Sequence, residues 1–117
     1  PSYRRIRLCN FLQAKTMLRD VKVKAEGIYG LWEMSLRQEN HPDFPDSTLQ
    51  VLVHQLRSSN IQLNILAVYA IWGLSTSAMT RKKLVDLDTV ELLYKLLNLA
   101  LSQKIITQRE QVEDELE

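Results

Sequence analysis

The sequence predicts an all-α fold built from two stacked helical repeats. Residues 20–35 and 60–75 are near duplicates at an offset of 40 residues. A second pair of apolar segments, residues 47–58 and 88–99, repeats at an offset of 41. Glycine and proline are scarce, with three of each in 117 residues, whereas an all-β fold needs many turns. A fixed period of this size is typical of helical repeat proteins.

The duplicated segments are predicted to be long core helices. "DVKVKAEGIYGLWEMS" begins at Asp20 and "NIQLNILAVYAIWGLS" begins at Asn60, and both residues are favourable N-caps. The second segment has apolar residues at 61, 65, 68 and 72 and again at 63, 67, 71 and 74. Two such stripes predict a helix buried over most of its circumference. Trp32 and Trp72 lie on the first stripe and are expected to fill the core.

The second pair of segments is predicted to form helices with capping boxes. "STLQVLVHQLRS" begins at Ser47 and "DTVELLYKLLNL" begins at Asp88, each with Gln or Glu three residues later. Residues 76–88 have room for a short helix before the second of these. In the first unit, Pro42 and Pro45 predict that the matching short helix is broken or replaced by a loop.

A period of 40 to 41 residues fits HEAT or armadillo units, which have about 40–47 residues. The segment "AMTRKKLVDLDTVELLYKLL" resembles the short first helix, acidic turn and second helix of the armadillo repeat. The segment "IQLNILAVYAIWGLS" resembles its third helix. The resemblance covers about residues 20–100. It implies a right-handed α-solenoid of the armadillo repeat family.

The chain is expected to be a single armadillo-like domain over residues 1–117. Residues 20–58 and 60–99 would be the two repeats, and residues 3–19 a partial preceding unit with Leu8, Phe11 and Leu12 inward. Residues 102–117 would be a polar cap or a disordered tail. The chain begins with Pro1 rather than Met, which suggests a processed chain or a fragment. Two repeats leave apolar ends, which predicts self-association or continuation into further repeats.

The composition argues against an enzyme and against a cofactor. His41, His54 and Cys9 are the only histidines and cysteine, and their positions indicate neither a zinc site nor a nucleophile–base pair. No glycine-rich phosphate loop is present. A single cysteine predicts a reducing, intracellular setting, the cytoplasm or the nucleus. No apolar run reaches the roughly 20 residues that span a bilayer, and no signal peptide precedes the first helix.

The resemblance implies that the third helices line a concave groove. On each third helix, the residues that face the groove must lie outside both apolar stripes. The small Gly73 is expected to leave room beside the ring of Tyr69. Acidic Glu26 and Glu33 would favour a partner with a basic segment. The expected partner-binding residues are Lys22, Glu26, Tyr29, Glu33, Gln62, Leu66, Tyr69 and Gly73.

The sequence therefore predicts a protein-interaction scaffold or adaptor that binds an extended peptide or a partner helix. One alternative is a structural segment of a larger solenoid that contacts only neighbouring repeats. Another is nucleic-acid binding through residues 1–24, which hold seven basic residues and one acidic residue, with Arg4, Arg5 and Arg7 beside Tyr3. The acidic to neutral groove row disfavours nucleic acid.

Overall fold

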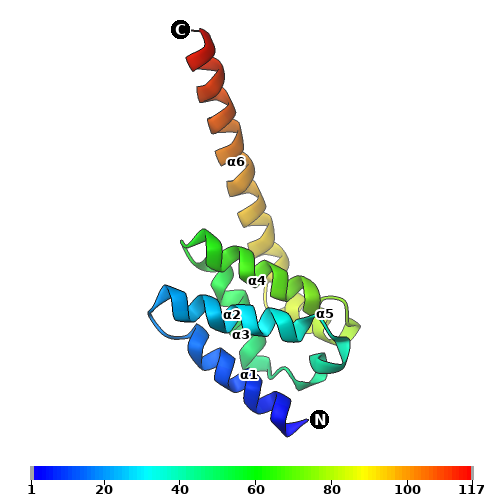
Figure 1. Ribbon diagram of the computed structural model, residues 1–117. Helices are drawn as coiled ribbons and strands as arrows, with labels where there is room; N and C mark the ends of the chain where they lie inside the picture. The colour runs from blue at the N-terminus through cyan, green and yellow to red at the C-terminus, as the bar shows by residue number, and fades with distance from the viewer. Residues whose placement is uncertain (1, 117) are drawn as a thin grey trace.

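The computed structural model describes residues 2–116, which form an all-α fold without a strand (Figure 1). This confirms the predicted fold class at the level of all-α. The helices in chain order are α1 (Tyr3–Thr16), α2 (Val21–Ser35), the 3-10 helix η1 (Gln38–Asp43), α3 (Asp46–His54), the 3-10 helix η2 (Gln55–Arg57), α4 (Ile61–Leu74), α5 (Ala78–Asp86) and α6 (Thr89–Leu116).

The two long duplicated helices begin where the sequence predicts. The Asp20 carboxylate accepts a hydrogen bond from the Val23 N–H at 3.1 Å, and the Asn60 side-chain oxygen accepts one from the Leu63 N–H at 3.1 Å. Each side chain satisfies a backbone donor that the first helical turn leaves without a partner. Both predicted N-caps are therefore confirmed.

The two predicted capping boxes are wrong. Helix α3 begins at Asp46, and the Ser47 hydroxyl instead donates to the side-chain oxygen of Gln13 at 3.2 Å. Asp88 has a φ of 62°, in the left-handed region, whereas an N-cap residue usually has an extended backbone. The tight turn between α5 and α6, in which the Asp88 N–H donates to the Val85 carbonyl, imposes this conformation.

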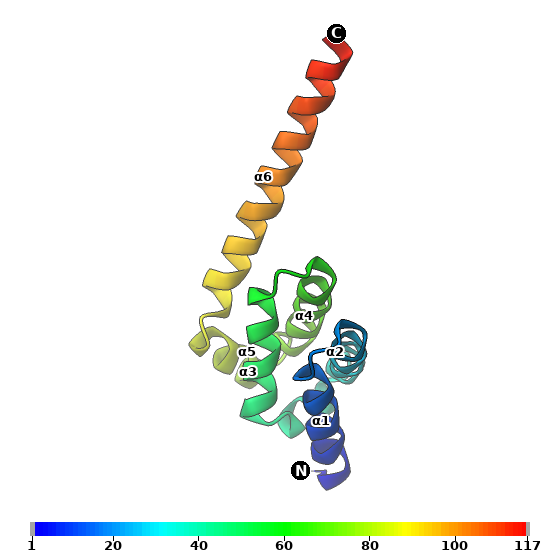
Figure 2. The ribbon, with the colours of Figure 1, turned by 90° about the vertical axis from the view of Figure 1, so that its left-hand side faces the viewer.

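The helices pack as pairs that lie side by side (Figure 2). Helices α1 and α2 form a hairpin, α2 lies along α4, and α3 packs beside α1 and α4. The approach of α1 to α2 is close at Gly27, where an added Cβ would lie 2.7 Å from the Leu12 carbonyl oxygen and 2.9 Å from the Thr16 nitrogen. A glycine at this position therefore sets the distance between the two helices.

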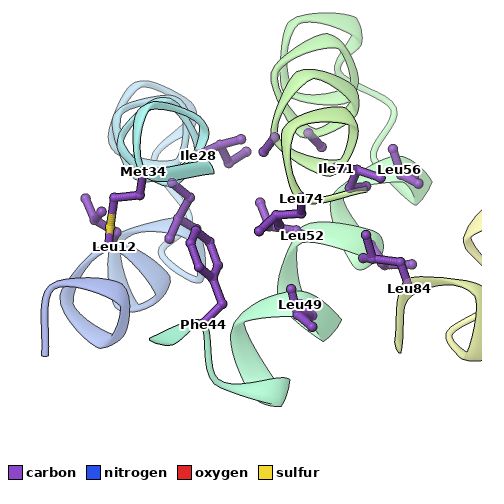
Figure 3. Close-up of a cluster of buried hydrophobic side chains, with 14 of the residues drawn as sticks. Leu12, Ile28, Met34, Phe44, Leu49, Leu52, Leu56, Ile71, Leu74 and Leu84 are labelled. Carbon is purple, nitrogen blue, oxygen red and sulfur yellow. The ribbon is translucent and has the colours of Figure 1, made fainter. Parts of the chain in front are cut away.

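The hydrophobic core lies between these pairs (Figure 3). The second stripe of α4 is buried as predicted, from Leu63 to Leu74, and it meets residues of α2 and α3. Burial of this apolar surface is the main source of stability, at roughly 25 cal/mol per Å². Among the largest fully buried side chains are Ile28, Leu31, Leu49, Leu52 and Leu74.

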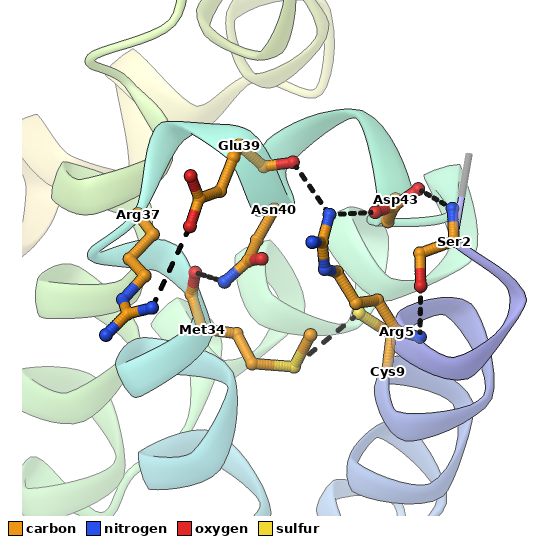
Figure 4. A network of polar contacts seen from close by, with 8 residues as sticks. All are labelled: Ser2, Arg5, Cys9, Met34, Arg37, Glu39, Asn40 and Asp43. Carbon is orange, nitrogen blue, oxygen red and sulfur yellow. Dashed lines mark hydrogen bonds and ion pairs between the residues drawn. The ribbon is translucent and has the colours of Figure 1, made fainter.

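The proline-containing connection keeps a short helix, but in 3-10 form. Helix η1 includes Pro42, so the prediction of a broken helix or a loop is corrected. Asp43 holds η1 against α1 by accepting from the Ser2 N–H at 2.9 Å and from Arg5 at 3.2 Å (Figure 4). The Ser2 N–H and then Arg5 lower the pKa of the Asp43 carboxyl, although its burial opposes this.

His41 connects η1 to the second unit. Its Nε2–H donates to the Ser35 carbonyl at 2.7 Å, and its Nδ1 lies 2.5 Å from the Ser77 hydroxyl at the start of α5. The ring is buried and both nitrogens are satisfied. This histidine therefore has a structural role, as a link between the turn after α2 and the turn after α4.

The two ends of the chain are both helical. Helix α6 continues through residues 102–116 as one helix exposed on all sides, and whether this segment is a polar cap or a disordered tail stays a prediction. At the other end, Leu12 of α1 is buried as predicted, but Leu8 and Phe11 are exposed. The Lys15 ammonium nitrogen lies 5.5 Å from the centre of the Phe11 ring. Among the described helices, none has the length and apolar composition needed to cross a bilayer.

Candidate protein-binding groove

The predicted binding row lies on the surface of α2 and α4. On α2, all four residues are exposed: Lys22, Glu26, Tyr29 and Glu33. On α4, Gln62 and Tyr69 are exposed, whereas Leu66 and Gly73 are half-buried. The row therefore avoids the core, and these residues remain candidates for binding.

Aromatic side chains connect the two halves of this surface. The ring of Trp32 stacks on Tyr69 with centroids 5.5 Å apart and an interplanar angle of 30°. Trp32 also meets Tyr29 edge to face, at 5.4 Å and 72°. Such geometries are favourable beyond the apolar area that they bury. Trp32 thus joins the tyrosines of both repeats into one aromatic surface.

An open groove of about 410 Å³ adjoins this surface at the C-terminal ends of α2 and α4. Tyr69 and Gly73 are the two predicted residues that line it. The other six lie outside it on the same two helices. Its lining residues are Trp32, Ser35, Leu36, Tyr69, Trp72, Gly73 and Thr76.

The prediction that Trp72 fills the core is wrong. Its side chain is 68% exposed, and Ile61 and Ile65 on the same stripe are exposed as well. Trp32 is half-buried and packs against the core, so for it the prediction holds in part. The difference arises because α4 covers the equivalent face of α2, while no described helix covers this face of α4.

Gly73 permits close helix packing rather than leaving room beside Tyr69. An added Cβ would lie 2.9 Å from the Ser35 Cβ and 3.0 Å from the Ser35 carbonyl oxygen. The small residue is therefore needed where α2 and α4 touch. The expectation of open space is corrected, and a larger side chain here would separate the two helices.

The charged members of the row differ in their availability. Glu26 lies 3.2 Å from the ammonium nitrogen of Lys15, so its charge is partly compensated. Glu33 has no ion-pair partner among residues 2–116 and remains available to a basic group. Arg5 is occupied by Asp43, which reduces the basic cluster proposed for nucleic acid to Arg4 and Arg7.

The buried ionisable groups make contacts within the fold. Burial, followed by the nearby Asp43 charge, raises the pKa of the Cys9 thiol to about 12, so the thiolate is absent at neutral pH. Cys9 instead contacts the Met34 sulfur at 3.9 Å. Within residues 2–116, no three His, Cys, Asp or Glu side chains are grouped so that they could hold a metal ion.

Sequence reasoning missed five groove residues: Trp32, Ser35, Leu36, Trp72 and Thr76. It places the two tryptophans in the core because each lies on an apolar stripe. The available signal was position in the stack: the outer stripe of the last long duplicated helix has no predicted neighbour within the chain. Leu36 and Thr76 follow the ends of the helices, where no periodicity marks them.

No protein-family model matches this chain, and neither does any curated protein. The function is therefore argued from the geometry of the groove.

Proposed function

We propose that this chain is a non-enzymatic protein-interaction scaffold, an adaptor that binds an extended peptide or a partner helix across α2 and α4. The observation that carries the proposal is the aromatic surface of Tyr29, Trp32, Tyr69 and Trp72 beside an apolar groove. Tyrosine and tryptophan are enriched among the residues that dominate binding energy at protein interfaces.

The aromatic surface is partly organised before a partner arrives. Stacking fixes Trp32 and Tyr69 relative to each other, so binding costs less side-chain entropy there. Trp72 is the adaptable member, because its ring is mostly exposed. A partner that covers Trp72 would remove a large apolar ring from water, the kind of burial that favours association.

The expected partner carries an apolar or aromatic anchor next to a basic residue. The groove volume of about 410 Å³ is in the range of sites that hold compact apolar groups, roughly 300–1,000 Å³. Glu33, exposed on α2, would attract a lysine or arginine flanking the anchor. An exposed pair of this kind contributes about 1 kcal/mol or less, so the anchor would dominate the affinity.

The order of the helices supports an armadillo-like architecture for the scaffold. The short helix η1 precedes the longer α3 and α4, and the short helix α5 precedes the long α6, as if a second such unit began there. The equivalent helices α2 and α4 lie side by side. We place the protein in a reducing intracellular compartment, with which the free, buried Cys9 is compatible.

Selection from a displayed library of random peptides tests the proposal. We expect binders with an aromatic or large apolar residue near a lysine or arginine. Tyr69→Ala and Trp72→Ala should each weaken such peptides at least about tenfold, because each removes a hot-spot ring. Glu33→Lys should weaken them less, and its effect should fade at high salt.

Tyr3→Ala is the matched control, because Tyr3 is an exposed tyrosine on α1 outside the groove. It should leave peptide affinity unchanged. Peptides whose affinity falls with Tyr3→Ala but does not change with the groove substitutions would contradict the proposal.

A structural segment of a larger solenoid remains the second candidate. The exposed stripe of α4, with Ile61, Ile65 and Trp72, corresponds to the stripe of α2 that α4 covers. In that case the occupant would be the third helix of a neighbouring repeat. The peptide selection separates the two, since a stripe that accepts only a packed repeat yields no peptide binders.

A further inference from the structure

Helix α6 carries an apolar stripe on the side away from the helix body. Leu92, Leu93 and Leu96 pack against the core, whereas apolar residues on the opposite side of the helix are exposed. The exposed residues recur at spacings of four and seven, one and two helical turns, which keep them on one face, with Gln108 as a polar interruption. The stripe runs from the first turn to the last and includes Val90, Tyr94, Leu101, Ile105, Val112 and Leu116.

We propose that this stripe binds the same stripe of a second copy, with the two α6 helices antiparallel. Three residue pairs of the stripe are symmetric about position 103, whereas exposed Leu97 would face Arg109 of the second copy, along the aliphatic part of its side chain. In an antiparallel pair centred there, Leu101 faces Ile105 of the second copy. Two turns further out, Tyr94 faces Val112, and at the ends Val90 faces Leu116. A two-fold interface requires this kind of self-complementarity, because each patch meets its own copy.

The charges of α6 favour the antiparallel orientation over the parallel one. Residues 104–116 contain two basic and four acidic residues, whereas residues 90–102 contain one of each. A parallel pair would place the two acidic ends together, and like charges in proximity are destabilising. An antiparallel pair places each acidic end beside a neutral segment.

The helix dipole adds to the same preference. The last turn of α6 has no basic residue, so its acidic side chains lie at the negative end of the helix. In an antiparallel pair, that end lies beside the positive end of the second copy's α6. The stripe shares no residue with the groove on α2 and α4, so this proposal is independent of the proposed function.

Sedimentation velocity of the whole chain over a range of concentrations tests the interface. We expect a reversible dimer of twice the chain mass. The double variant Leu101→Glu, Ile105→Glu should raise the dimer dissociation constant at least about a hundredfold, because it places carboxylates in an apolar contact.

The matched control is Leu99→Glu, Ile106→Glu. It makes the same two changes at exposed residues on the other side of α6 and should leave the dimer intact. Loss of the dimer in both variants would overturn the assignment to this stripe, and a strictly monomeric wild-type chain would overturn the proposal.

Disulfide cross-linking tests the orientation. Lys104 and Gln111 lie on one flank of the stripe, about two helical turns apart. With Lys104→Cys, the two copies of the new thiol should lie close together and cross-link on oxidation. With Gln111→Cys, the two thiols should lie about 24 Å apart along the antiparallel pair and should not cross-link. Cross-linking of Gln111→Cys would overturn the antiparallel arrangement. Native Cys9 is fully buried and stays out of the reaction.

Discussion

Trp32 and Trp72 occupy the same place in two copies of one sequence pattern, yet their surroundings differ. Trp32 lies between α2 and α4, where it stacks on Tyr69 and packs against the core. Trp72 lies on the stripe of α4 that no described helix covers, and it is 68% exposed. The helices themselves are alike, with matching N-caps at Asp20 and Asn60. The position of each helix in the stack, rather than its sequence, decides whether its tryptophan is covered.

The comparison shows how repetition can produce a binding surface. The apolar stripe of α2 is covered by α4, whereas the equivalent stripe of α4 has no described helix over it and forms an exposed apolar face. In this chain that face continues into the groove between Leu36 and Trp72. Contiguous exposed apolar surfaces often mark interaction sites.

The largest expected effect is on the two tryptophans. Trp32→Ala should lower the free energy of unfolding by about 3 kcal/mol, because it removes a ring that packs on the core and on Tyr69. Trp72→Ala should lower it by less than about 0.5 kcal/mol, since an exposed side chain contributes little. Urea denaturation followed by circular dichroism measures both values.

Iodide quenching provides an independent check on the same pair. With Trp32→Phe in place, the remaining Trp72 should be strongly quenched, whereas Trp32 in a Trp72→Phe background should be partly protected. Equal quenching of the two indoles would contradict the comparison.

A smaller effect is expected at Gly27 and at its counterpart Ala67. Gly27→Ala should destabilise the protein by about 1–2 kcal/mol, because the new methyl group meets the backbone of α1. Ala67→Gly should cost about 1 kcal/mol through lost helix propensity. Thermal unfolding of both variants tests this. A higher melting temperature for Gly27→Ala would show that α1 can move away, and the stated cause would be wrong.

The third prediction concerns the short helices of the two units. The lowered pKa of Asp43 means that its stabilising contribution is present above the unfolded pKa of about 3.9 and is lost as the pH falls through the folded pKa. Wild-type stability should therefore decline with acidification below about pH 4. Asp43→Asn should be less stable by about 1 kcal/mol at neutral pH and should show a shallower decline.

Urea titrations at several pH values measure this difference. The control is Asp46→Asn, which changes an exposed carboxylate paired with Lys83 between α3 and α5. Because that ion pair is exposed, it contributes little to stability. The stability of Asp46→Asn should therefore vary with pH much as the wild type's does. Equal profiles for wild type and Asp43→Asn would contradict the role assigned to Asp43.

The smallest effect is expected at the turn before α6. Asp88 has a positive φ, and a left-handed backbone costs roughly 1 kcal/mol for a residue with a Cβ. Asp88→Gly should therefore stabilise the protein by up to about 1 kcal/mol. Asp20→Gly, at the matched cap before α2, should instead be slightly destabilising, by a few tenths of a kcal/mol. Chemical denaturation distinguishes gain from loss.

Much of the helical framework could be predicted, because it depends on local signals. The N-caps, the buried stripe of α4 and the short helix α5 follow from side-chain type and spacing within one turn or two. The row of candidate groove residues also follows from periodicity, because it consists of the helix positions that lie outside the two apolar stripes. The capping boxes failed because the α3 boundary depends on Pro45 and the α6 boundary on a turn with left-handed Asp88.

The sequence by itself determined the all-α class, the period of the repeat and the residues that can face outward on α2 and α4. Only the tertiary structure decided that Trp32 is covered and Trp72 is not, that Gly73 brings α4 against Ser35, and that α6 continues outward instead of turning back. Helical periodicity fixes which residues share a face, but not what lies opposite that face. Contacts between helices depend on the order in which the helices stack and on where the stack ends.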